Sequence, residues 1–252
     1  MKNLCIVVLF ILSMSASALA SFAPGPGTPG PGYPGYRPGP QCYPQPNDPY
    51  FWDQIARIEN DMLHWDRSYY SAPAGSPQEH YADQRRRDAG DAFLRTLQTH
   101  QIEKFQFPDL ESIALTLDSK YAATRSGSYL ESVYDTARRA VFSAYIQSTT
   151  DAISCLGNYF EAEQWGLELN RRYNSSPSRS VKEQAYDQLR RRAFDHAVVL
   201  FQYTLSRMYY QDVQRAFYDY DQRYRSAPAR SVLEAYFRQM RDAAERELRG
   251  RR

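Results

Sequence analysis

The chain has 252 residues, and its 31 lysines and arginines are almost balanced by 29 aspartates and glutamates. This balance argues against a nucleic-acid-binding protein, because such proteins rely on an excess of cationic side chains to neutralise phosphates. The sequence also contains only three cysteines and four scattered histidines, so a metal site of the zinc-finger type has no support.

Residues 1–20 read as a secretory signal peptide. Lys2 precedes an apolar run from Leu4 to Leu12, and small residues follow, ending in Ala18-Leu19-Ala20. The apolar run is too short to cross a bilayer comfortably, since a crossing takes about 20 residues. We expect cleavage after Ala20 and a secreted or periplasmic product without stable membrane insertion. An uncleaved membrane anchor is the alternative.

Residues 21–47 form a proline- and glycine-rich segment that we expect to be a disordered arm. Proline fixes φ and removes a hydrogen-bond donor, glycine raises the entropy cost of ordering, and only tyrosines are available for burial. The segment is expected to be a spacer in front of the next domain, or else a tether or a tyrosine-rich adhesive arm.

Two cysteines remain once the signal peptide is removed, Cys42 in the arm and Cys155 in the domain that follows. An exported protein reaches an oxidising compartment, where a single bridge between them is one expectation. The alternatives are a buried free thiol at Cys155 or an intermolecular disulfide through Cys42.

Residues 48–252 are expected to form one all-α domain. Apolar residues from Ile55 to Tyr69 recur at steps of three and four, which is the period of a helix packed on one face. Alternating runs of β-branched residues ended by Asn-Gly or Gly-Gly turns, the signals of strands, are absent. About 205 residues are enough for a single core.

A phrase repeats four times in this domain, as in "RYNSSPSRSVKEQAY" and "RYRSAPARSVLEAY". Each copy has a tyrosine, a serine seven residues later and a glutamate three residues after the serine. The tyrosines are Tyr69, Tyr121, Tyr173 and Tyr224, at intervals of 52, 52 and 51 residues. The serine and glutamate pairs are Ser76 and Glu79, Ser128 and Glu131, Ser180 and Glu183, and Ser231 and Glu234. The chain is therefore expected to contain four internal repeats.

Each phrase is expected to be a helix–turn–helix corner, because Ser-x-x-Glu is the pattern of a capping box. The serine oxygen would accept from the N3 backbone N–H, and the glutamate would reach back to the serine N–H. This capping role explains the four glutamates better than acid–base catalysis does. An acidic or amide residue three positions before each tyrosine is expected to accept hydrogen bonds from donors in the turn. These residues are Asp66, Asp118, Asn170 and Asp221.

Two architectures fit the four repeats. Residues 180–224 contain no proline or glycine and keep a helical spacing of apolar residues, so one long helix could connect two corners. We therefore expect an antiparallel helical bundle built from four repeats of about 52 residues. A compact solenoid of four αα-hairpins is the alternative.

Arginines follow each corner and are the candidates for binding an anion or a partner. They are Arg85, Arg86, Arg138, Arg139, Arg190, Arg191, Arg192 and Arg241. The other interpretation is a solvated face in which these arginines pair with carboxylates along the helix. Tyrosine is abundant, and a surface rich in Tyr and Arg is typical of partner interfaces.

No catalytic, metal-binding or cofactor-binding motif was found, and no cofactor is expected. We expect a non-enzymatic module that binds or scaffolds an envelope or extracellular protein or polymer, and not a nucleic acid. A factor binding anionic polymers through the arginines is one alternative. An all-α hydrolase acting on peptidoglycan, with Glu111 or Glu131 in its site, is a weaker one. The sequence does not indicate the oligomeric state.

Overall fold

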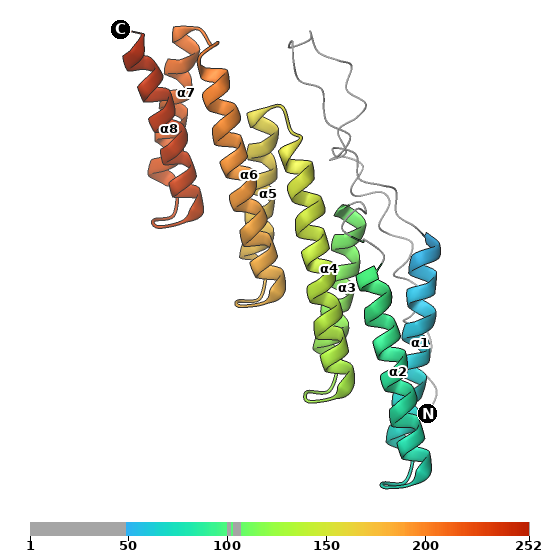
Figure 1. Ribbon diagram of the computed structural model, residues 1–252. Helices are drawn as coiled ribbons and strands as arrows, with labels where there is room; N and C mark the ends of the chain where they lie inside the picture. The colour runs from blue at the N-terminus through green and yellow to red at the C-terminus, as the bar shows by residue number, and fades with distance from the viewer. Residues whose placement is uncertain (1–48, 100–101, 103–106, 252) are drawn as a thin grey trace, which may run out of the picture. The chain divides into compact units, whose positions relative to one another are not determined.

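The computed structural model describes residues 49–99, 102 and 107–251, and this part of the chain forms eight α-helices and no strands (Figure 1). The helices are α1 (Pro49–Ser71), α2 (Pro77–Thr99), α3 (Phe107–Ala123), α4 (Tyr129–Ser154), α5 (Tyr159–Asn174), α6 (Val181–Leu205), α7 (Tyr210–Ser226) and α8 (Val232–Gly250). The prediction of an all-α fold is confirmed. The predicted signal peptide and arm, residues 1–47, lie outside the described residues.

The helices pair as four hairpins, α1 with α2, α3 with α4, α5 with α6 and α7 with α8. The turn of each hairpin is one of the four corners expected from the repeated phrase (Figure 1). Neighbouring hairpins meet through their second helices, since α2 packs on α4, α4 on α6 and α6 on α8. One repeat therefore makes one hairpin, and successive hairpins pack side by side.

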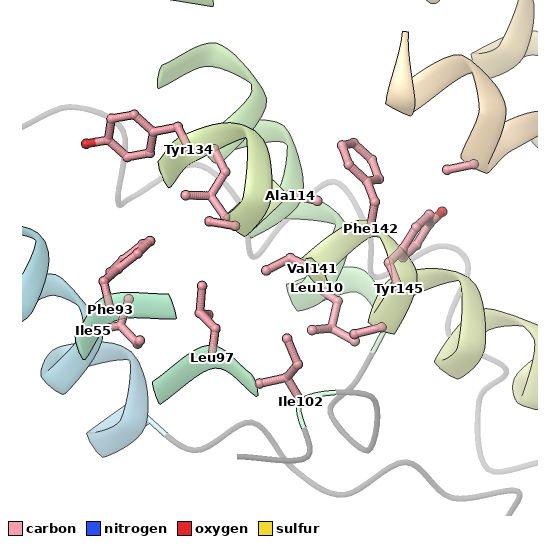
Figure 2. Packing of buried hydrophobic residues seen from close by; sticks show 14 of the residues in the cluster. Ile55, Phe93, Leu97, Ile102, Leu110, Ala114, Tyr134, Val141, Phe142 and Tyr145 are labelled. Carbon is pink, nitrogen blue, oxygen red and sulfur yellow. The ribbon is translucent and has the colours of Figure 1, made fainter. Parts of the chain in front are cut away.

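The hydrophobic core runs through these contacts as two clusters that share α5 and α6. Leu189 and Ala193 of α6 belong to the cluster formed with α1 to α5, and Phe194 and Phe201 to the cluster formed with α5, α7 and α8. Figure 2 shows the first cluster, in which side chains from α1 to α4 converge between the first two hairpins. Burying apolar side chains from both hairpins is what makes one hairpin depend on the next.

The prediction of one continuous helix from residue 180 to 224 is wrong. Helix α6 ends at Leu205 and α7 begins at Tyr210. Arg251, just after α8, donates to the carbonyl oxygens of Leu205 at 2.7 Å and Met208 at 2.5 Å. The Leu205 oxygen also accepts from the Met208 N–H at 3.2 Å, so Arg251 adds a second donor where the helix ends. The apolar spacing continues across the break because both helices pack on the same core.

Helix α4 is likewise separated from α5. It ends at Ser154, and Asn158 caps α5 by accepting from the Phe160 N–H at 2.9 Å. His196 of α6 lies 2.8 Å from the Leu156 carbonyl oxygen, so a side chain 40 residues away occupies that acceptor. The helices are therefore connected as in the solenoid of αα-hairpins. They are not connected as in a bundle whose long helices run from one corner to the next.

The corner serines lie where the capping-box pattern places them. The Oγ atoms of Ser76, Ser128, Ser180 and Ser231 accept from the N–H groups of Glu79, Glu131, Glu183 and Glu234, respectively. The glutamates differ from the expectation, because each accepts from the N–H one residue before the serine. Those donors are Gly75, Gly127, Arg179 and Arg230. The serine N–H is already used, for example by the Pro177 carbonyl oxygen at 3.2 Å from Ser180 N.

The residue that donates to the glutamate has a positive φ in all four corners. Gly75 and Gly127 have φ of 73° and 76°, and Arg179 and Arg230 have φ of 63° and 60°. Glycine adopts this left-handed conformation without steric cost, whereas a residue with a Cβ does not. Two corners therefore keep the same backbone geometry at an energetic cost.

Candidate functional site

An arginine clamp joins the two helices of the first hairpin. The Arg86 guanidinium stacks on Tyr69, with Cζ 3.6 Å from the ring centroid. Arg86 Nη1 donates to Asp66 at 2.9 Å, and Nε donates to Asp83 at 2.7 Å. The Arg86 side chain is only 6% exposed, so its charge is neutralised inside the hairpin. We call the tyrosine, the arginine and the two acceptors the clamp.

The clamp recurs in every hairpin. The equivalent residues are Tyr121, Arg138, Asp118 and Asp135 in the second hairpin, and Tyr173, Arg190, Asn170 and Asp187 in the third. In the fourth hairpin Arg241 lies 4.5 Å from the Tyr224 ring centroid and 3.7 Å from Asp221, and it pairs closely with Asp242. This last clamp is looser and its arginine is more exposed.

Charge pairing in the clamp is strong enough to offset burial. Burial acts to raise the pKa of Asp83, but hydrogen bonds from Arg87 and Arg86 outweigh it and hold that pKa below its ordinary value. The acceptors three residues before the tyrosines were expected to bind donors in the turn. That expectation is wrong for Asp66, whose donor is the Arg86 guanidinium on the other helix. The long side chain of Arg86 extends from α2 to Asp66 on α1, so the donor comes from the facing helix and not from the turn.

A second recurring contact joins each hairpin to the next. Glu59 of α1 accepts from Lys120 Nζ of α3 at 2.6 Å and from the Tyr134 hydroxyl of α4 at 2.8 Å. The Glu59 side chain is 12% exposed. We call a glutamate in this position a junction acid. It binds two donors of the following hairpin, so it fixes which surfaces meet.

The second junction repeats the first, and the third rearranges it. Glu111 of α3 accepts from Arg172 and from the Tyr186 hydroxyl, the latter at 2.6 Å. The junction acid of the third contact is Glu163 of α5, whose side chain is 1% exposed.

Glu163 receives its hydroxyl donor from a different position. Phe237 stands where Tyr134 and Tyr186 stand in the earlier hairpins, and the Tyr220 hydroxyl of α7 donates to Glu163 at 3.0 Å instead. Arg223 supplies the cation at 2.8 Å. Burial raises the pKa of Glu163, and attraction to Arg223 and the hydrogen bond from Tyr220 lower it by less.

The arginines proposed as a binding set do not share one environment. They occupy four successive positions of the repeat, and each step along a helix turns by about 100°. Arg86, Arg138 and Arg190 are buried in the clamps, and Arg241 pairs with Asp242.

The other four arginines lie at the surface. Arg139 and Arg191 are 58% and 57% exposed, and each pairs at i,i+4 with the aspartate of its clamp. Arg85 stacks at 5.3 Å from the Trp65 ring. Arg192 has no ion pair in the described part of the chain. The eight predicted arginines therefore divide between the clamps and the helix surfaces, and their role in binding stays a prediction.

A groove opens between the first two hairpins, with a volume of about 350 Å³. Its lining comes from α1, α3, the second corner and α4, and consists of Leu63, Asp66, Tyr70, Lys120, Ala123, Thr124, Arg125, Ser128, Leu130 and Tyr134. Two of its charged groups are already paired, Asp66 with Arg86 and Lys120 with Glu59. The groove combines apolar walls with polar groups, as ligand sites do.

Sequence reasoning missed the junction acids, although a signal was present. Glu59, Glu111 and Glu163 recur at the same 52-residue step as the tyrosines. The predicted pairing of Cys155 with Cys42 stays a prediction. Cys155 is disulfide-bonded, and Cys42 lies outside the described residues.

Within the described residues, no group of three or more histidines, cysteines, aspartates or glutamates is placed to hold a metal ion. None of the helices in that part of the chain combines the length and the low polarity that a membrane crossing requires. Comparison of the chain with family models, curated proteins and solved structures gave no match.

Proposed function

We propose that the chain is an exported, non-enzymatic repeat protein that binds or scaffolds a protein or polymer in the periplasm or at the cell surface. The observation that carries the proposal is the use of the repeated polar residues. In each repeat they cap a helix, clamp a hairpin or join two hairpins. What is repeated is therefore a means of building an extended surface, which is the usual basis of binding by repeat proteins.

The carboxylates considered for catalysis have such structural partners. Glu111 is held by Arg172 and Tyr186, and Glu131 accepts from the Gly127 N–H. Glu163 has a raised pKa, which is often a mark of a catalytic acid. Its side chain is 1% exposed, however, so a substrate does not reach it in this conformation.

Binding of an anionic polymer through the predicted arginines receives less support. Three of them are buried, and three more are paired with carboxylates. Paired charges attract a polyanion weakly, because the pair presents little net charge to it.

The proposal can be tested by capturing partners from the envelope extract of the source cells. The bait is the mature chain, residues 21–252, and the control is a matched bait carrying Glu111→Ala and Glu163→Ala, with its loss of helicity checked by circular dichroism. A partner retained by the folded bait and lost from the control supports a binding role. Turnover of a peptide or peptidoglycan substrate by the purified chain would contradict it.

A further inference from the structure

The groove between the first two hairpins departs from the repeat at two places. Tyr70 follows the first clamp tyrosine, and Arg125 lies in the second corner. At the second junction the same positions hold Ala122 and Pro177, and at the third they hold Asn174 and Pro228. A fold that works with alanine or asparagine and with proline at these positions does not need Tyr70 and Arg125.

The Tyr70 ring meets the Tyr69 ring edge-on at 5.1 Å and lies 5.9 Å from the Arg86 guanidinium, but both Tyr70 and Arg125 keep exposed surface for a ligand. Tyr70 is 53% exposed, and Arg125 is exposed and has neither an ion pair nor a side-chain hydrogen bond in the described part of the chain. The other charged groups of the groove are compensated, because Lys120 binds Glu59 and Asp66 binds Arg86.

The carboxylate of the second corner is also engaged, since Glu131 accepts from the Gly127 N–H. Arg125 is thus a cation of the groove without a counter-ion among the described residues. Guanidinium groups bind carboxylates through two parallel hydrogen bonds. The Tyr70 ring and the apolar side chains of Leu63 and Leu130 line the same groove and favour a flat apolar group beside the anion.

We propose that this groove binds a carboxylate attached to an aromatic group, with Arg125 holding the carboxylate and Tyr70 packing on the ring. Two sources present this chemistry, a free aromatic acid and the C-terminal aromatic residue of a partner chain. The second source rests on the proposed binding function, whereas the first does not.

Titration of the mature chain, followed by NMR, tests the site with 3-phenylpropionate as the probe. The neutral amide of the same compound is the matched control ligand. We expect chemical-shift changes with the acid and at least tenfold weaker binding of the amide, because a hydrogen bond to a charged group is lost. A tetrapeptide ending in phenylalanine, with a free or an amidated C-terminus, distinguishes the two sources. Tenfold tighter binding of the free peptide than of 3-phenylpropionate indicates a partner's C-terminus, and equal binding indicates a small acid.

Variants taken from the repeat itself locate the site. Arg125→Pro and Tyr70→Ala introduce residues that the fold already uses at these positions. We expect at least tenfold weaker binding for the first and a several-fold loss for the second, with unchanged helicity by circular dichroism. Arg179→Gly removes an exposed cation from the third corner and should leave binding unchanged.

Two results would overturn the groove proposal. One is absence of binding by the folded chain to every acidic probe, and the other is an equal loss of binding in Arg125→Pro and Arg179→Gly. Neither result bears on partner capture from the envelope extract, so failure of the groove is distinguishable from failure of the proposed function.

Discussion

The faces that meet between hairpins and the faces at the two ends of the array differ at equivalent positions. At each junction a buried or largely buried glutamate of one hairpin accepts from a lysine or arginine of the next, as Glu111, whose side chain is 13% exposed, does from Arg172. In the last hairpin Gln214 takes the place of the junction acid, and it is exposed. In the first hairpin Ser68 takes the place of the cation, and Ala82 that of the hydroxyl donor.

The last described hairpin therefore lacks the acid of the contact that joins hairpins, and the first lacks its cation and its hydroxyl donor. Among the described hairpins, a charge is present where it has a partner, and a neutral residue stands at the equivalent position on a face that meets no other described hairpin. Terminal repeats in such arrays carry a different outer face, which keeps them from attracting another repeat. The junction acids thus identify the joining surfaces better than the apolar residues do, because apolar residues occur on every face that packs.

The largest effect should come from removing a junction acid. We expect Glu111→Ala to destabilise the chain by about 2–4 kcal/mol, because it leaves the half-buried Arg172 and the Tyr186 hydroxyl without their acceptor. Gln214→Ala at the end of the array should cost less than about 0.5 kcal/mol, the usual range for a surface change. Chemical denaturation followed by circular dichroism measures both. Equal losses in the two variants would remove the distinction between junctions and ends.

The third junction tests whether the hydroxyl that donates to the junction acid can come from either of two positions. Tyr220→Phe should cost about 1.5–3 kcal/mol, since Glu163 loses a hydrogen bond made to a charged group. Adding Phe237→Tyr restores a hydroxyl at the position used in the first two junctions, and we expect it to recover part of the loss. If the double variant is no more stable than Tyr220→Phe, the positions of the donors are not interchangeable.

A substitution in a corner should change the free energy of unfolding by less, and should raise it. Arg179→Gly relieves a left-handed backbone conformation that costs about 1–2 kcal/mol with a Cβ, while glycine adds about 0.5–1 kcal/mol of chain entropy to the cost of folding. A net gain of about 0.5–1 kcal/mol is expected from thermal or chemical unfolding. Gly127→Arg, the reverse change in the second corner, should lose a similar amount. A destabilised Arg179→Gly chain would show that the Arg179 side chain makes a contribution larger than the strain.

Local sequence rules predicted the corners well and the connections between them poorly. The capping serines and the helical class follow from residues a few positions apart, such as Ser180 and Glu183. The break after Leu205 does not, because its carbonyl oxygen accepts from Arg251, 46 residues away, in addition to the turn bond from the Met208 N–H. The apolar spacing on either side of the break is the same as in one continuous helix.

Local sequence rules were also unable to identify the site residues. A run of three arginines from Arg85 to Arg87 gives no sign that only the middle one is buried. Its burial follows from the clamp, which needs the ring of Tyr69 and a carboxylate from another helix. Nothing local marks Arg125 either, and it stands out only when the second corner is compared with the other three.

The smallest effect we expect is a pH dependence at the third junction, where opposing influences act on the pKa of Glu163. Burial raises the pKa of Glu163 above its ordinary value of 4.5, while Arg223 and Tyr220 pull it back. A folded state with the higher pKa holds the proton more tightly than the unfolded chain does. Its contribution to stability is then fully present below about pH 4.5 and is lost as the pH rises through the raised pKa. The free energy of unfolding of the unmodified chain should therefore fall relative to that of Glu163→Gln over this window. A difference that stays constant or grows with rising pH would show that pairing with Arg223, and not burial, dominates at this junction.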